Sequence, residues 1–159
     1  MESTVVGNWH QSIESFSYST EEFYDRLERT LTAQNIPNLK MERAGLPEGG
    51  FLSAYRLYLQ LKRGNLTFYV CAAPFGVNFF VSWWLMQAGD GCLQGCATTF
   101  LPFLTLLKRQ RTFYEEDTAV MFREAMHEAV LSVLREVLGD GGKARVERMR
   151  APTVAKSLV

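Results

Sequence analysis

Residues 51–86 read FLSAYRLYLQLKRGNLTFYVCAAPFGVNFFVSWWLM, and their apolar side chains recur at every second position over long runs. This alternation is typical of β-strands that turn one face toward a core. Glycine, asparagine and proline interrupt the pattern at 63–65 and at 74–78, where they favour tight turns. We therefore predict three antiparallel strands, over 51–62, 66–73 and 79–86.

The last of these strands is apolar on both faces and contains two adjacent tryptophans, Trp83 and Trp84. Neighbouring residues of a strand point to opposite faces, so the two rings cannot form one stacking platform. We expect one ring to pack in the core. The other should cover the second face or contact a partner.

Helices are predicted on both sides of this strand region. Ser19 with Glu22, and Thr112 with Glu115, are capping-box pairs that open apolar stripes of helical spacing over 20–35 and 113–138. A short strand at 39–43 follows the first helix. The predicted fold is an α+β two-layer sandwich: a four-stranded antiparallel meander with an N-terminal helix and a long C-terminal helix on one face.

Length and composition fit one domain. The chain has 159 residues and a formal net charge of zero, so it lacks the basic footprint of a nucleic-acid-binding protein. We predict one α+β domain over 1–139, with an irregular lead at 1–18, followed by a hinge and basic tail at 140–159. Three cysteines without a secretory pattern at the start indicate a reducing compartment, and we expect a cytoplasmic location.

Two blocks of the sequence carry a resemblance. The first runs from Cys71 to Leu85 and the second from Asp117 to His127. They are similar to recurring blocks of an uncharacterised family of bacterial proteins, and the likeness extends from about Tyr55 onward. It implies one domain body and a bacterial source, and it brings no activity with it.

Cys92 and Cys96 are the only candidate nucleophiles or metal ligands with local context. Their C-x3-C spacing, with only His10 and His127 as remote partners, is unlike the paired ligands of zinc sites, so we expect no metal and no cofactor. The order helix, four-strand meander, cysteine is that of ubiquitin-conjugating enzymes, where the cysteine carries a thioester. No His-Pro-Asn element precedes either cysteine. Two buried, unreactive thiols are therefore our first interpretation, with no catalytic residue.

An apolar connector follows the strands. Asp90 is the only charged residue between Arg63 and Lys108, and the run TTFLPFLTLL at 98–107 ends in basic residues. Pro102 and its short length prevent this run from spanning a bilayer as a helix. It can fold back onto the sheet, dock on a protein, or touch a membrane surface. The predicted partner-binding residues are Trp84, Phe100, Leu101, Phe103, Leu104, Leu107, Lys108, Arg109 and Arg111.

The polar residues do not form a nucleophile, base and oxyanion set, and no phosphate-binding motif is present. We therefore expect a non-catalytic protein-interaction or assembly (adaptor) module of the bacterial cytoplasm, acting through a protein partner or self-association and without nucleic acid. Two alternatives stay open. One is a thioester carrier like the ubiquitin-conjugating enzymes, and the other is a peripheral membrane-contact protein.

Overall fold

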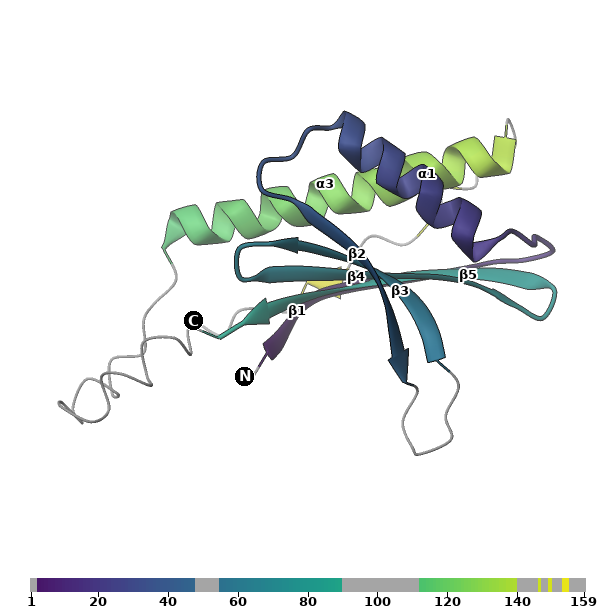
Figure 1. Cartoon of the computed structure of the whole chain (residues 1–159), viewed down its shortest axis with the longest axis horizontal. Coiled ribbons are helices and arrows are strands. Elements are labelled where there is room, and N and C mark those ends of the chain that lie inside the picture. Colours follow the sequence, from purple (N-terminus) through teal and green to yellow (C-terminus); the bar gives the residue numbers. More distant parts are fainter. Residues whose placement is uncertain are drawn as a thin grey trace.

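The computed structural model describes residues 3–47, 55–89, 112–139, 146, 149, 153 and 154. It shows an α+β fold in which two helices lie on one side of an antiparallel sheet (Figure 1). In chain order the elements are β1 (Ser3–Ile13), α1 (Thr20–Ala33), β2 (Lys40–Pro47), β3 (Tyr55–Arg63), β4 (Leu66–Phe75), β5 (Asn78–Ala88), α3 (Phe113–Leu138) and β6 (Thr153–Val154).

The strands are ordered β2-β3-β4-β5-β1-β6 across an open sheet. Strands β2 to β5 are neighbours in sequence and in space, which confirms the predicted antiparallel run. Strand β1 then lies beside β5, from the pair Ser3↔Ala88 to the pair Ile13↔Phe79. The two-residue strand β6 pairs with β1 on its other side.

The predicted four-stranded meander is therefore too small, because β1 and β6 extend the sheet. The predicted irregular lead at 1–18 is wrong over 3–13, which form β1. Gly7 and Asn8 imitate a turn signal, and β5, the partner of β1, lies far along the chain, so no local hairpin pattern reveals the strand. The strand predicted at 39–43 is also too short, because β2 continues to Pro47 and an edge strand tolerates proline.

Parts of the predicted tail lie against the domain. Val146 is buried in the core, and Thr153 and Val154 pair with Asn8 and Gly7 of β1. Strand pairing is satisfied by main-chain groups, so this sequence region needs no apolar pattern of its own. The division of the chain at residue 140 stays a prediction.

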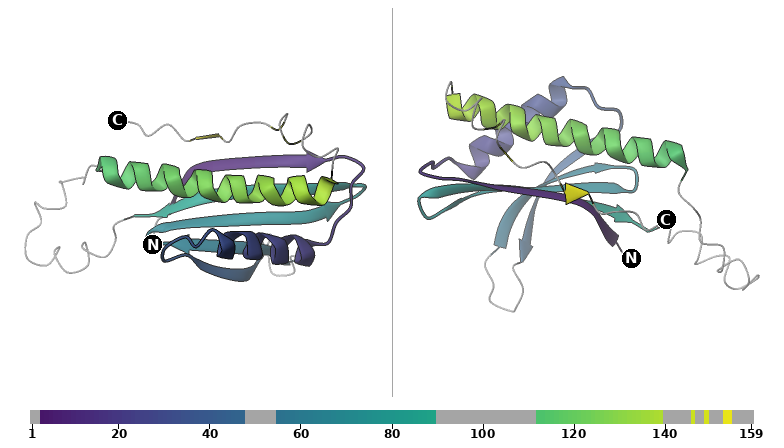
Figure 2. Two further views of the ribbon diagram at one scale, coloured as in Figure 1. Left: turned by 90° about the horizontal axis from the view of Figure 1, so that it is seen from above. Right: turned by 180° about the vertical axis from the view of Figure 1, so that it is seen from behind.

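The core lies between the sheet and the two helices, which cover the same face (Figure 2). Alternate residues of β3, β4 and β5 meet the apolar stripes of both helices there, as the two periodicities predict. The largest fully buried side chains are Trp83, Tyr24, Phe23, Phe68, Phe79, Ile13, Leu27, Leu31, Leu59, Leu61, Leu85 and Met126.

Both helices start where the sequence predicts. At α3 the capping box is complete: Glu115 N–H donates to the Thr112 hydroxyl at 3.2 Å, and Thr112 N–H donates to the Glu115 carboxylate at 3.0 Å. At α1 the Ser19 hydroxyl accepts from Glu22 N–H at 3.4 Å. These caps satisfy main-chain donors that have no partner within the helix.

Candidate functional site

The face of the sheet opposite the helices carries the candidate site. On β5, Trp83 is fully buried toward the helices, whereas Trp84 leaves 43% of its surface exposed on the other side. This confirms that one tryptophan packs in the core. We call the side of Trp84 the helix-free face.

A groove of about 350 Å³ opens on the helix-free face. Its size is at the lower end of the range of ligand pockets. All five long strands contribute to it, and its lining combines three aromatic rings with aliphatic side chains and no charged group. The lining residues are Ser3, Leu46, Tyr58, Thr67, Tyr69, Trp84, Met86 and Ala88.

The strand register places the aromatic rings. Tyr69 of β4 lies directly opposite Trp84 of β5, so both rings stand on the same face at neighbouring positions. The Gln60 side-chain amide of β3 donates to the Tyr69 hydroxyl at 3.0 Å. That bond restrains the Tyr69 ring, which is part of the groove lining.

One wall of the groove belongs to the hairpin β2–β3, which supplies Leu46 and Tyr58. The ladder between β3 and β4 ends at the pair Leu59↔Val70, although both strands continue. Beyond this pair the hairpin bends away on the side opposite the helices (Figure 1). The groove is concave because of this bend.

The hydroxyl of Tyr24, from α1, lies in the fork between β3 and β4. It donates to the Leu57 carbonyl oxygen at 2.8 Å, has the Val70 carbonyl oxygen at 3.2 Å, and accepts from Ala72 N–H at 3.1 Å. Continuing the register would place Leu57 opposite Ala72, so the hydroxyl replaces a missing ladder bond. Burial raises the pKa of Tyr24 well above its usual range, and the hydroxyl keeps its proton.

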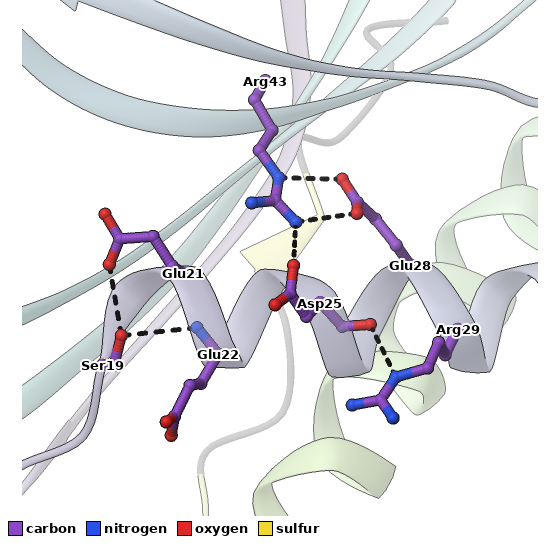
Figure 3. A network of polar contacts seen from close by, with 7 residues as sticks. All are labelled: Ser19, Glu21, Glu22, Asp25, Glu28, Arg29 and Arg43. Atoms are coloured by element: carbon purple, nitrogen blue, oxygen red, sulfur yellow. Dashed lines mark hydrogen bonds and ion pairs between the residues drawn. The ribbon is translucent and has the colours of Figure 1, made fainter.

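Arg43 fixes the same hairpin from its edge (Figure 3). Its guanidinium donates to both carboxylate oxygens of Glu28, at 3.0 and 2.8 Å, and to Asp25 at 2.5 Å. These bonds, those to Glu28 first, raise the pKa of Arg43 further above its usual range. The guanidinium also lies 5.9 Å from the Tyr24 ring centre. Helix α1 therefore positions the hairpin that forms one wall of the groove.

Charge is divided between the two layers of the molecule. Helix α1 carries four carboxylates and two arginines, and α3 carries six carboxylates and two arginines, so the helical layer is negative. By the strand alternation, the outward positions of β2 and β3 hold Lys40, Arg56 and Lys62 against Glu42. A neutral chain thus has a positive rim beside its groove.

His127 is buried in the core, where it contacts two tryptophans. Its Nδ1 accepts a hydrogen bond from the Trp83 indole N–H at 3.0 Å, and its ring meets Trp9 edge-on with 5.1 Å between centres. Burial lowers the pKa of His127, so the neutral ring is favoured. His127 is thus a buried histidine whose Nδ1 has a hydrogen-bond partner. No group of three or more potential metal ligands occurs among the residues that the structure describes.

Of the predicted partner-binding residues, Trp84 lies in the groove. The others, Phe100, Leu101, Phe103, Leu104, Leu107, Lys108, Arg109 and Arg111, lie outside the described residues, as do Cys92 and Cys96. Tyr58 and Tyr69, which line the groove, are not among the predicted site residues. Their alternation gave the correct face, but only the register and the bend of the hairpin bring them to Trp84.

Comparison of the chain with protein-family models, with curated proteins and with solved structures gives no match. The family resemblance of Cys71–Leu85 and Asp117–His127 stays a prediction. None of the described helices is both long enough and apolar enough to cross a membrane.

Proposed function

We propose that the protein is a non-catalytic interaction module, and that a partner protein docks on the helix-free face. The observation that carries the proposal is the exposure of Trp84 beside Tyr69 in a preformed concave groove. Large aromatic side chains in a pocket are the usual energetic anchors of protein interfaces. The groove is large enough for one or two apolar side chains of the partner.

The same feature argues against a purely structural role for Trp84. In the core, Trp83 already fills the space between sheet and helices, so Trp84 contributes little to that packing. An indole that stays half in water has a large apolar surface available for a partner. Arg43 and Tyr24 hold the groove open beforehand, which reduces the entropy lost on binding.

A site-specific photo-crosslinker tests this proposal in the native host. A photoreactive amino acid at Ala88, on the groove lining, should give a discrete crosslinked band, whereas one at the exposed Met121 of α3 should not. Adding Trp84→Ser should remove the Ala88 band, and adding Met121→Ser should leave it. Mass spectrometry of the band distinguishes a different protein from a second copy of this chain.

A band at Ala88 that persists with Trp84→Ser would show that the contact near Ala88 does not depend on the Trp84 ring, and would contradict the proposal that Trp84 anchors the partner. The absence of any band from Ala88 would contradict docking at the groove. Circular dichroism of each variant verifies that the fold is intact.

A further inference from the structure

The rim of the groove indicates the chemistry of the partner. Building on the docking function proposed above, we propose that the docking segment is acidic: an extended stretch that places an apolar side chain in the groove and carboxylates against Lys40 and Lys62. Three features of the molecule support this: the pairing of the two lysines, their place relative to the groove, and the negative charge of the helical layer.

Lys40 of β2 and Lys62 of β3 are directly opposite each other in the antiparallel register, and both are exposed. Directly opposite side chains have Cβ atoms about 5 Å apart, and like charges in this position repel. Neither lysine forms an ion pair with any residue that the structure describes. Glu42 shares their face but lies opposite Gln60. An external carboxylate between the two lysines would relieve the repulsion.

The lysine pair lies in one row across the strands with two residues of the groove. Lys62 lies opposite Thr67 of β4, and Thr67 lies opposite Met86 of β5. Thr67 and Met86 both line the groove. Strands are about 4.8 Å apart, so Lys40, two strands from Thr67, is about 10 Å away from it. An extended chain advances about 3.3 Å per residue. One segment can therefore fill the groove and present carboxylates two or three residues further along.

Other classes of partner fit this face less well. Leu46, Met86 and Ala88 make part of the lining aliphatic and concave, which suits an apolar side chain better than a series of stacked bases. Few outward cations lie on β2 and β3, whereas tracking a nucleic-acid backbone takes many. The negative helical layer faces away from the groove and would orient an acidic segment toward the lysines.

The test uses the full chain labelled with ¹⁵N, because each of its three tryptophans reports through its own indole N–H signal. The probe is the blocked peptide Leu-Gly-Asp-Asp, with Leu-Gly-Lys-Lys and Ala-Gly-Asp-Asp as matched controls. The first peptide should shift the Trp84 signal and leave that of Trp83, which is buried, unchanged. Both controls should bind more weakly.

The lysines are then tested directly. The double change Lys40→Gln and Lys62→Gln should weaken binding of the acidic peptide roughly five- to tenfold, as expected for two rim charges. The matched double change Arg29→Gln and Arg135→Gln removes the same charge from the helical layer and should have little effect. Raising the salt concentration should weaken binding to the unmodified protein but affect the lysine variant less.

Three results would overturn the inference. Equal binding of the acidic and the basic leucine peptides would remove the role of charge, while leaving the docking function intact. If an oligothymidylate shifted the Trp84 indole signal and the peptide did not, the face would be assigned to binding single-stranded nucleic acid. No shift with any probe at millimolar concentration would exclude acidic-segment binding, and the Ala88 crosslink would still decide the docking function.

Discussion

Trp83 and Trp84 are neighbours on β5, yet the two faces of the sheet place their indole rings in opposite environments. Trp83 is fully buried among the helices, and its indole N–H is bonded to His127. Trp84 stands on the helix-free face beside Tyr69, partly in water. The alternation of a strand thus assigns one tryptophan to stability and frees the other for contacts. Each of the following changes tests that division.

The largest expected effect comes from Trp83→Ala, which removes a buried indole and leaves His127 without its donor. We expect a loss of about 3–5 kcal/mol in the free energy of unfolding. Trp84→Ala should lower it by only about 1 kcal/mol, because the ring is half exposed. Urea denaturation followed by circular dichroism measures both.

Similar losses for the two changes would mean that the helix-free face is covered in solution. That result would contradict an open groove and therefore the docking proposal. If Trp84→Ala lowered the free energy of unfolding and Trp83→Ala did not, the packing between sheet and helices would not be the main source of stability.

The next effect concerns Tyr24, which bridges the fork between β3 and β4. Tyr24→Phe keeps the ring but removes the partner of Ala72 N–H and of the Leu57 carbonyl. A buried polar group without a partner costs about 1–3 kcal/mol, and exchange of the Ala72 amide hydrogen should accelerate. Tyr18→Phe, at a half-buried hydroxyl that accepts from Arg26, is the matched control and should cost less.

An unchanged stability and a protected Ala72 amide in Tyr24→Phe would show that β3 and β4 close and pair directly. The groove would then be narrower. The peptide experiment on this variant would show whether its width matters for binding.

A smaller effect is expected from pH. Because burial lowers the folded-state pKa of His127, the unfolded chain binds this proton more tightly. Stability should be complete above about pH 6.5, the unfolded value, and should decrease below it by at most about 1.4 kcal/mol per pH unit. His127→Gln should reduce this dependence in urea titrations at several pH values. The charged side chains that act on His127 are Glu124, Glu128, Arg123 and Arg135.

A pH profile that His127→Gln leaves unaltered would show that other groups cause the acid sensitivity. It would also weaken the assignment of His127 as the acceptor for Trp83.

The smallest effect is expected at Arg43. Arg43→Lys keeps the charge but loses the two-point contact with Glu28, and both partners are partly exposed. We expect a loss of about 0.5–1 kcal/mol, measured by thermal and urea denaturation. Arg123→Lys, which pairs with its neighbour Glu124 on α3, is a control that leaves the hairpin untouched. If Arg43→Lys changed peptide binding without changing stability, the hairpin position itself would be the sensitive element.

Much of the fold could be predicted because its signals are local. Alternation in β3, β4 and β5 gave the inner and outer faces, and the Thr112–Glu115 box gave the start of α3. Strand β1 could not be found this way. Its partner β5 is distant in sequence, and Gly7 and Asn8 interrupt its pattern, so only the folded structure identifies it.

The candidate site was predictable only in part. Trp84 followed from its face on β5. Tyr69 joins it through the β4–β5 register, and Leu46 through the bend of the hairpin β2–β3, where the Tyr24 hydroxyl of α1 bonds both strands. Neither the register nor the bend can be predicted from the local pattern of residues. The charge of the whole chain also concealed the separation of a negative layer from a positive rim.

The position of β1 has a consequence for how the chain folds. This strand is synthesised before β5, the strand that it lies against, so it has no lasting partner until residues 78–88 have been made. Joining them closes a long loop, which slows folding relative to the local hairpins. Trp9 and Ile13, which are buried in the folded protein, belong to this strand. Strand β1 therefore joins the sheet no earlier than β5, and α3, which follows β5 in the chain, then completes the core.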